Sequence, residues 1–368
     1  MMTLMIVFMA VPVAIQALFW LLSTHQLVRP SGIFPKETLD VSLIICARNE
    51  ADNLMNNLSY FLNQKGVNME VIVVDDHSTD QSNSVLEELA IHHSKLHIIQ
   101  MESKKHPGKK DALLKGILSA QYDIILLSDA DCYPVSDSWA ALMSAPIAEG
   151  YSIVAGYSPI LPEKTHINSY MRYENVITAL QYIGLGRTGC PYMGVGRNLA
   201  YHKKAIEEVG YFEKHTDVAA GDDDLTVQSI LLKKGRESIY FQTDIRSFVN
   251  TKGMHEAHQY VLQKTRHYSV SSKYPATNQY VLAGIHLSWV LFYLGIGMCA
   301  VMHLWYAGIL LLVTHFIIRW LGWIKIKKGL GQSFSMVDWV GFDILYPWIT
   351  LILTIFGLLK KQKAWKSF

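Results

Sequence analysis

Residues 41–50, VSLIICARNE, and residues 71–80, VIVVDDHSTD, decide the fold of this chain. Each stretch begins with an apolar run and ends in polar and acidic residues. A short continuous apolar run of this kind is typical of a buried parallel strand. Between the two stretches, Leu54, Leu58 and Phe61 recur at helical spacing. The region therefore predicts a strand–helix–strand unit.

The alternation of strands and helices continues along the chain. Residues 78–80 include natural N-cap residues and predict the start of a second helix. Residues 96–99 and 123–127 predict two more strands, and residues 107–120 predict the helix between them. This order predicts an α/β domain built on a parallel sheet with right-handed crossovers.

Polar residues follow three of the predicted strands, at residues 47–50 (ARNE), 75–78 (DDHS) and 128–131 (SDAD). Ligands of such sheets bind beyond the carboxyl ends of the strands, so these segments are expected to line one site. The turns after these predicted strands carry neither GxGxxG nor GxxxxGK[ST], which argues against a dinucleotide-binding domain and against a P-loop.

Asp129 and Asp131 flank a single small residue just past a predicted strand. Neighbouring carboxylates repel each other, so the pair is costly unless a cation binds there. Mg²⁺ or Mn²⁺, bound together with substrate phosphates, suits such a pair. The alternative is a turn stabilised by aspartate side chains.

Residues 221–225, GDDDL, precede a predicted helix that ends with Lys233 and Lys234. Acidic residues at a helix start interact favourably with the helix dipole, so capping alone explains part of the pattern. Three consecutive aspartates exceed what capping needs. One of them is a candidate general base that deprotonates a hydroxyl.

A basic stretch, QKTRH at residues 263–267, lies just before a long apolar region. Its cations, together with Lys273, could contact anionic lipid headgroups. Alternatively, Arg266 could offset negative charge on a leaving diphosphate. Residue type alone favours neither interpretation.

The distribution of charge separates the middle of the chain from its ends. Hydrophobic residues make up 50% of the 368 residues and charged residues only 17%, which argues against disorder and against a wholly soluble protein. No Asp, Glu, Lys or Arg occurs in residues 1–28 or 274–318, whereas residues 29–273 resemble a soluble domain. A net charge of +2 gives no reason to expect nucleic-acid binding.

The apolar regions predict membrane helices, each of which needs ~20 apolar residues. Residues 1–24 are expected to form an N-terminal transmembrane helix rather than a cleaved signal peptide, because a basic n-region and a small-residue cleavage site are not evident. Residues 280–323 predict a transmembrane hairpin with its turn near His303. Residues 336–359 predict a third C-terminal membrane segment that either spans or re-enters, followed by a basic tail at residues 360–368.

Positive charges predict the orientation in the membrane. Arg29 and Lys36 flank the first span on the domain side, which predicts a cytoplasmic catalytic domain and a multi-pass protein of the inner or plasma membrane. Four lysines follow residue 359, and a full span at 336–359 would place them outside, against the same rule. The four cysteines lie far apart without a CxxC pair, which predicts reduced, mostly buried thiols.

The motifs taken together resemble glycosyltransferase family 2, the inverting enzymes of the GT-A fold, in its integral-membrane form. The resemblance covers about residues 40–274, which predicts a GT-A domain at 38–275. It rests on the order and spacing of seven segments: VSLIICARNE, VIVVDDHSTD, HPGKKDALLKGI, LLSDADCYP, GVGRNLAYHKKAIEEVGYF, GDDDLTVQ and QKTRHY. It implies a Rossmann-like nucleotide-diphospho-sugar transferase domain flanked by N-terminal and C-terminal transmembrane helices.

The resemblance also implies roles for individual residues. Residues that would bind the sugar nucleotide and its diphosphate are Glu50, Asp76, Lys109, Asp129 and Gln263. Asp129 and Asp131 match the family's DxD motif and would hold Mg²⁺ or Mn²⁺. Asp222 would be the general base, with Asp223 as the alternative, and Arg266 matches the arginine of the QxxRW motif.

Two positions depart from the family pattern. Gly221 stands where the family usually has Glu, which leaves the register of the base open. His267 stands where polymer-extending members carry Trp, which weakens the interpretation that this chain is a processive polymer synthase.

The expected partners are a nucleotide-diphosphate sugar, a lipid-linked or saccharide acceptor, and the membrane, without nucleic acid. The leading expectation is a hexosyltransferase-type enzyme that acts on a lipid-linked acceptor. A processive polysaccharide synthase is one alternative, and a non-catalytic GT-A membrane scaffold for polysaccharide export is another.

Overall fold

The computed structural model describes residues 2–29, 32–216, 218 and 220–359. These residues form two compact units. We call the unit built from Pro30–Leu161 and Pro191–Gly253 the sheet unit. We call the unit that contains Pro162–Cys190 and the regions at the two ends of the chain the helical unit.

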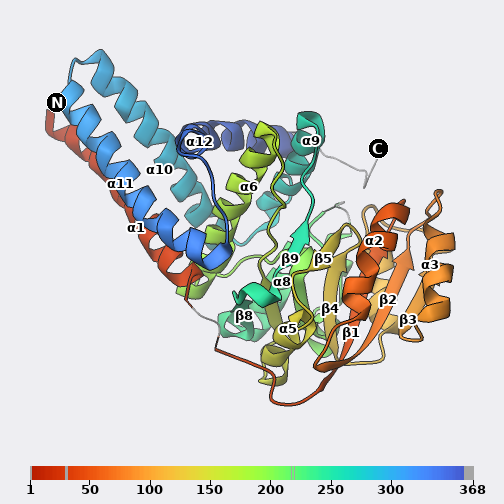
Figure 1. Ribbon diagram of the computed structural model, residues 1–368. Helices are drawn as coiled ribbons and strands as arrows, with labels where there is room; N and C mark the ends of the chain where they lie inside the picture. The colour runs from red at the N-terminus through yellow and green to blue at the C-terminus, as the bar shows by residue number, and fades with distance from the viewer. Residues whose placement is uncertain (1, 30–31, 217, 219, 360–368) are drawn as a thin grey trace. The chain divides into compact units, whose positions relative to one another are not determined.

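The described part of the sheet unit contains nine strands and six α-helices, many of which are labelled in Figure 1. The strands are β1 (Leu39–Ala47), β2 (Val67–Asp75), β3 (Leu96–Gln100), β4 (Ile124–Asp129), β5 (Cys132–Pro134), β6 (Ile153–Gly156), β7 (Leu199–His202), β8 (Ile239–Gln242) and β9 (Val249–Thr251). The helices are α2 (Ala51–Leu62), α3 (Ser82–His92), α4 (Lys110–Ser119), α5 (Trp139–Ala148), α7 (Lys203–Glu208) and α8 (Asp224–Lys234).

Seven strands form the main sheet in the order β3-β2-β1-β4-β7-β6-β8. The first four are parallel, as the alternation of strands and helices predicts. β7 runs antiparallel to both β4 and β6, so the complete sheet is mixed. β5 and β9 form a separate two-stranded antiparallel sheet. The Rossmann-like α/β fold expected from the sequence is confirmed.

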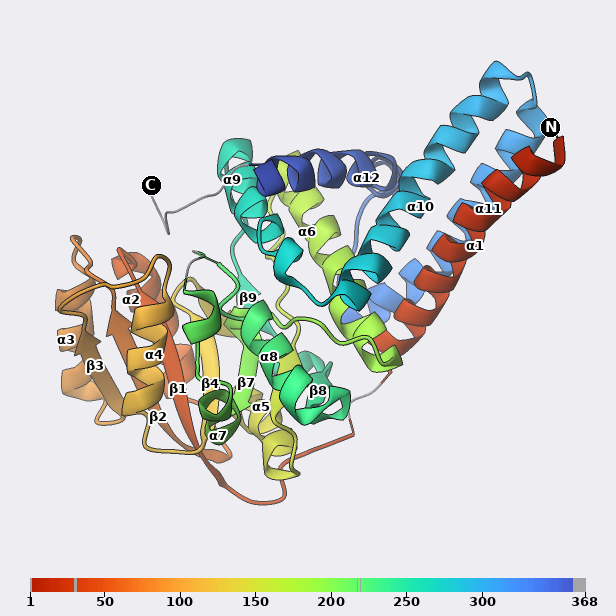
Figure 2. The same cartoon turned by 180° about the vertical axis from the view of Figure 1, so that it is seen from behind.

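Helices cover both faces of the sheet because the central strands are apolar on both faces. Val41, Leu43 and Ile45 join one core with side chains of α2, α3 and α5. Ile44 points the other way, and a Cβ on Gly116 of α4 would lie 2.6 Å from its side chain. Figure 1 shows α2 and α3 in front of the sheet, and Figure 2, from behind, shows α4, α7 and α8.

The predicted start of the second helix at residues 78–80 is wrong. α3 begins at Ser82, two residues beyond the predicted start, because residues 78–80 form a hydrogen-bonded turn before it. Asp80 Oδ1 accepts a hydrogen bond from the Ser82 N–H at 3.0 Å, and the Ser78 hydroxyl donates to Asp75 Oδ1. The turn therefore occupies the positions where the sequence predicted a first helical turn.

The helical unit contains six α-helices within the described residues: α1 (Met2–Leu27), α6 (His166–Ala179), α9 (Ala257–Tyr268), α10 (Ala276–Val301), α11 (Trp305–Leu330) and α12 (Met336–Leu359). Residues Met9–Leu27 of α1 and the whole of α10, α11 and α12 are long and apolar enough to cross a membrane. α1, α10 and α11 run side by side, whereas α12 runs across their direction (Figures 1 and 2).

The hairpin turn predicted near His303 is present between α10 and α11. Together the two helices extend from Ala276 to Leu330, beyond both ends of the hairpin predicted at 280–323. The apolar run sets the length that can lie in hydrocarbon, but helical hydrogen bonding continues through the basic residues until Gly331, which adopts a left-handed φ of 67°.

The division of the chain also differs from the expected domain at 38–275. Pro162–Cys190 and the segment that begins at Met254 pack within the helical unit. α6 buries Tyr173 against aromatic rings of α11 and α12, including Trp323 and Phe342. These segments are not long apolar runs, so composition alone assigns them to the soluble domain.

A buried polar cluster lies among the apolar helices. Asp343 of α12 is fully buried and is contacted by His315 Nε2 at 2.7 Å and by Arg319 Nε at 3.1 Å. The hydroxyls of Tyr293 and Tyr173 donate to the same carboxylate at 2.6 and 3.1 Å. One carboxylate thus joins side chains of α6, α10 and α11 to α12.

Candidate functional site

The polar segments predicted to meet at one sheet edge do meet there. Ala47 at the end of β1 pairs with Asp75 of β2, and Cys46 pairs with Asp129 of β4. Because β1, β2 and β4 are parallel, the loops that follow them emerge at the same edge.

Hydrogen bonds tie the loops after β1 and β2 to each other. Asn49 Oδ1 accepts from the Thr79 N–H at 2.8 Å, and the Asn49 N–H donates to Ser78 Oγ at 2.9 Å. Asn49 has a φ of 54°, a left-handed conformation that asparagine tolerates better than most residues. The two loops therefore form one framework around the strand ends.

Asp76 and Glu50, both expected at the nucleotide, are buried in this framework. Asp76 is only 1% exposed; it contacts Lys104 Nζ, and His77 Nδ1 lies 3.1 Å from its Oδ1. Glu50 Oε2 accepts from Asn53 Nδ2 at 2.6 Å. The sequence did not single out Lys104, because it lies in the loop before α4 and comes to Asp76 only through the fold.

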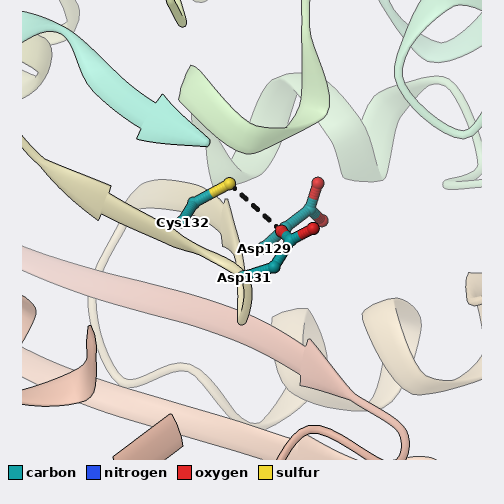
Figure 3. Close-up of side chains that lie close together, drawn as sticks. All are labelled: Asp129, Asp131 and Cys132. Carbon is teal, nitrogen blue, oxygen red and sulfur yellow. Dashed lines mark hydrogen bonds between the residues drawn. The ribbon is translucent and has the colours of Figure 1, made fainter. Parts of the chain in front are cut away.

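Figure 3 shows the acidic pair beyond β4 together with the neighbouring thiol. One oxygen from each of Asp129 and Asp131 and the Cys132 sulfur lie within 4.8 Å of one another. The thiol donates to Asp131 Oδ1 at 3.2 Å. Burial and the adjacent Asp129 charge raise the pKa of Asp131 above its ordinary value, as expected for crowded like charges.

The two carboxylates of this group suit a hard divalent cation. Mg²⁺ and Mn²⁺ prefer oxygen ligands, which Asp129 and Asp131 supply. Burial and the two neighbouring carboxylates raise the pKa of the Cys132 thiol well above its ordinary value, so it stays protonated and acts as a hydrogen-bond donor. The sequence-based assignment of the two aspartates as a potential metal site is therefore compatible with the geometry.

Lys109 lies between the acidic pair and the GDDDL segment. Its Nζ is 2.7 Å from Asp129 Oδ1 and 3.8 Å from Asp222 Oδ2. Burial would lower the pKa of Lys109, but the charges of Asp129 and Asp222 outweigh that effect and raise it. Lys109, Asp222 and Asp223 line one pocket together with Cys46 and Gly196.

The three aspartates of GDDDL have different environments. Asp223 caps α8, since its Oδ1 accepts from the Asp224 N–H at 2.9 Å and its Oδ2 from the Gly196 N–H at 3.0 Å. Asp222 instead faces the ammonium groups of Lys109 and Lys110. The carboxylate of Asp223 is occupied by backbone donors, so the geometry favours Asp222 as a base.

Lys110, a residue to which the sequence assigned no role, is 1% exposed. Its Nζ donates to the carbonyls of Val218 at 2.7 Å and Ala220 at 3.0 Å, and it lies 4.0 Å from Asp222 Oδ1. Lys110 thus anchors the loop that carries Asp222. The doubled lysine after Pro107-Gly108 was a signal, but the sequence does not show that the second lysine points inward.

The GVGRN turn at residues 194–198 is held by Asn198. Asn198 Oδ1 accepts from Trp139 Nε1 at 2.9 Å, and its amide donates to two backbone carbonyls. The adjacent Arg197 donates to Ser158 Oγ at 2.7 Å, and its positive charge stabilises the ionised form of Asp131. Like Lys104 and Lys110, Arg197 carries no role that the sequence predicted.

Gln263 and Arg266 lie on α9, in the helical unit. Arg266 is half-buried, and its Nε has no hydrogen-bond partner among the residues that the structure describes. The exposed His267 follows it near the end of the helix. The expectation that Gln263 and Arg266 contact a diphosphate remains a prediction.

All four cysteines are free thiols, as expected. Cys46, Cys132 and Cys299 are buried and Cys190 is partly exposed. Burial raises the pKa of Cys46 to about 12, so this thiol is protonated at neutral pH.

Comparison with known proteins agrees with the fold and the motifs. A family model described as Glycosyl transferase family 2 matches residues 42–210. A beta-monoglucosyldiacylglycerol synthase from a Nostoc species is 36% identical over 104 residues, covering 26% of this chain and 21% of that protein. A poly-beta-1,6-N-acetyl-D-glucosamine synthase from Staphylococcus epidermidis is 23% identical over 195 residues, covering 50% of this chain and 43% of that protein. The chain thus matches less than half the length of either relative.

A solved structure extends the similarity of fold to nearly the whole chain. A mannosyltransferase from Pyrobaculum calidifontis, in complex with GDP-Man and Mn²⁺, superposes with a TM-score of 0.62 at 17% identity. The match covers 96% of this chain and 99% of that one. Residues 42–210 are therefore similar in sequence to glycosyl transferase family 2, and the fold is similar to that of a solved mannosyltransferase.

Proposed function

We propose that this protein is a membrane-bound inverting glycosyltransferase that moves a sugar from a nucleotide-diphosphate donor to a lipid-linked acceptor. The observation that carries the proposal is the arrangement of Asp129, Lys109 and Asp222 in succession at the carboxyl edge of the sheet, with spacings of 2.7 and 3.8 Å. This arrangement combines a phosphate-side carboxylate, a cation and a candidate base within one site.

In the proposed reaction, Asp222 accepts the proton of the acceptor hydroxyl as its oxygen attacks the anomeric carbon. The bond to the diphosphate breaks in the same displacement, which inverts the anomeric centre. Lys109 supplies positive charge beside the departing diphosphate. Asp129 and Asp131 would hold a divalent cation, which when bound supplies Lewis-acid stabilisation of phosphate oxygens.

The remaining assignments follow the resemblance to the family. Asp76 and Glu50 would bind the base and ribose of the donor, in the framework formed by the loops after β1 and β2. Gln263 and Arg266 would contact the diphosphate, and the guanidinium of Arg266 would offset its negative charge.

A lipid-linked acceptor is supported by the long apolar helices next to the basic stretch of α9. A polyprenyl-phosphate glycolipid, diacylglycerol or a ceramide-like lipid would fit this setting. A processive polysaccharide synthase is the second candidate, because one relative is a polysaccharide synthase by name. His267, a smaller and more polar ring than Trp, favours the transfer of one or a few sugars. A non-catalytic scaffold is disfavoured because Asp76, Asp129, Asp131 and Asp222 are all present.

The test is incubation of the purified protein with a panel of nucleotide sugars, Mg²⁺ or Mn²⁺, and a lipid extract. We expect release of a nucleoside diphosphate that depends on one donor and on added lipid, and a lipid-extractable product that is heavier by one or a few sugars in mass spectrometry. A ladder of long polysaccharide would establish the processive alternative instead. No release with any donor would contradict a transferase function.

Asp131→Ala is expected to remove the metal-dependent part of donor binding while the protein stays folded. The substitution leaves Asp129 alone, and a single carboxylate holds Mg²⁺ or Mn²⁺ poorly. Calorimetric titration with UDP and with GDP, each with and without Mn²⁺, measures the effect. Asp137→Ala is the matched control, because Asp137 is half-exposed and pairs with Lys65. Equal Mn²⁺ dependence in the wild type and in Asp131→Ala would remove Asp131 from the metal site.

We propose that α1, α10 and α11 cross the membrane and that α12 lies along its cytoplasmic surface. This is supported by the direction of α12 across the other three helices (Figures 1 and 2). It also keeps the lysines after residue 359 in the cytoplasm, in agreement with the positive-inside rule. The sheet unit would face the cytoplasm, where sugar nucleotides are made.

Cysteine labelling in intact cells tests this topology in a Cys190→Ser background. Ser94→Cys and Ser367→Cys are expected to resist a membrane-impermeant maleimide until the cells are permeabilised. Leu304→Cys, in the turn between α10 and α11, is expected to react at once. Labelling of Ser367→Cys alone before permeabilisation would show that α12 spans the membrane. Labelling of Ser94→Cys before permeabilisation would place the sheet unit outside the cell.

A further inference from the structure

A buried carboxylate of the helical unit binds the helix that carries Gln263 and Arg266. Glu174 of α6 is 2% exposed. Its Oε2 lies 2.8 Å from Lys264 Nζ, and its Oε1 accepts a hydrogen bond from the Tyr268 hydroxyl at 3.0 Å. Both partners belong to α9, so a single side chain of α6 holds α9 at two points one helical turn apart.

The face of α9 that meets α6 is extended by a third residue. Tyr260, Lys264 and Tyr268 are spaced by four residues and therefore lie along one side of the helix. The ammonium of Lys264 is 5.7 Å from the centre of the Tyr260 ring, which packs edge-on against Tyr170 of α6. Burial and the charge of Glu174 keep the pKa of Tyr268 well above its ordinary value, so its hydroxyl remains a donor.

A second side of α9 packs against α12. A Cβ on Gly357 would lie 2.7 Å from the carbonyl oxygen of Thr265 and 3.1 Å from the backbone nitrogen of Ser269. The absence of a side chain at Gly357 thus lets α12 approach the backbone of α9 closely. Contacts on two sides determine both the rotation of α9 about its axis and its position along that axis.

Gln263 and Arg266 lie on the side of α9 that these contacts leave open. The two residues are three positions apart and so share a face. Successive residues of an α-helix are 100° apart about its axis, so Gln263 and Arg266 each lie more than a quarter turn around α9 from Lys264. α6 is itself fixed, because the hydroxyl of Tyr173, next to Glu174, donates to the buried Asp343. Rotation of α9 would therefore be resisted by a connected set of buried contacts.

We propose that Glu174 is a positioning residue that holds α9 in the orientation in which Gln263 and Arg266 act on the donor diphosphate. The inference rests on the proposed function, since it assumes the role assigned to Arg266. Glu174 contacts Lys264 and Tyr268, and both residues belong to the helical unit. Its effect on transfer would be transmitted entirely through the placement of α9.

Glu174→Gln in the full-length protein tests the inference, because it keeps the shape of the side chain and removes its charge. We expect kcat to fall about 10- to 100-fold through misplacement of Arg266. Donor KM should change by less than twofold, and hydrogen exchange of residues 257–268 should become faster. Glu256→Gln is the matched control, because Glu256 is exposed at the start of α9 and pairs with His258. If Glu174→Gln fails to fold, Tyr268→Phe removes one of the two contacts and should give a smaller change in the same direction.

A double-mutant cycle with Arg266→Ala separates positioning from general destabilisation. If Glu174 acts through Arg266, adding Glu174→Gln to Arg266→Ala should lower kcat no further. Multiplicative losses in the double variant, an unchanged exchange rate in α9, or a normal kcat in Arg266→Ala would each overturn the inference. A wild-type protein that turns over no donor would refute the proposed function itself, and the exchange measurement would still decide whether Glu174 holds α9.

Discussion

Replacing Asp222 with asparagine is expected to slow sugar transfer by about 10²- to 10⁴-fold, the usual cost of losing a general base. The amide has nearly the same shape as the carboxylate but cannot take the proton of the acceptor hydroxyl. Donor binding is expected to persist, because Asp129 and Asp131 would still hold the phosphate side of the site. The initial rate of nucleoside diphosphate release measures transfer, and calorimetry measures donor affinity.

Asp223→Asn is the matched control for this experiment. Its amide oxygen can still accept a hydrogen bond from the backbone N–H of Gly196 or Asp224, so the cap of α8 is largely kept. Transfer should stay close to the wild-type rate. If Asp223→Asn is inactive while Asp222→Asn is not, the role of base belongs to Asp223. If neither substitution slows transfer, this acidic segment does not supply the base.

Asp343→Ala is expected to destabilise the helical unit by about 3–5 kcal/mol, the typical cost of leaving a buried charge without its partner. The substitution leaves the guanidinium of Arg319 buried without a carboxylate. Arg319 is held between the rings of Trp20 and Trp289, with its Cζ 4.3 and 4.1 Å from their centres, and it donates to Gln16 Oε1 at 2.8 Å. These contacts keep the cation in place and prevent it from reaching water.

Thermal unfolding of the detergent-solubilised protein measures this effect, with Asp338→Ala as the control on the same helix. Asp338 is partly exposed and lies 3.8 Å from the exposed His166, so its loss should change the melting temperature little. The double variant Asp343→Leu/Arg319→Met should recover much of the stability, because replacing a buried ion pair by apolar residues is often neutral. Equal melting temperatures for Asp343→Ala and Asp338→Ala would show that the buried cluster contributes nothing to stability.

The sequence could determine features that depend on neighbours along the chain. The apolar runs at residues 41–46 and 123–127 predicted buried parallel strands because burial on both faces requires such composition. The strand ends then predicted where Asp76, Asp129 and Asp131 would meet, since carboxyl ends of parallel strands share an edge. The long apolar helices were equally visible, because spanning hydrocarbon sets a minimum length of apolar sequence.

Only the tertiary structure distinguished residues of the same type. Asp222 and Asp223 are adjacent and chemically identical, and what separates them is that backbone N–H groups of Gly196 and Asp224 occupy the carboxylate of Asp223. Lys109 and Lys110 differ in the same way, because one faces Asp129 and the other faces two backbone carbonyls. Such differences arise from segments far apart in the chain, so no local pattern encodes them.

The assignment of α6 and α9 was also decided by tertiary structure. Both helices contain polar and charged residues and read as parts of a soluble domain, yet they pack among the apolar helices. They do so because buried Glu174 joins α6 to α9, and buried Asp343 of α12 binds side chains of α6 and α11. The sequence therefore determined the sheet, its acidic edge and the membrane-length helices. Which side chains pair across those elements depended on long-range contacts, because a buried charge is stable only where the fold brings its partners to it.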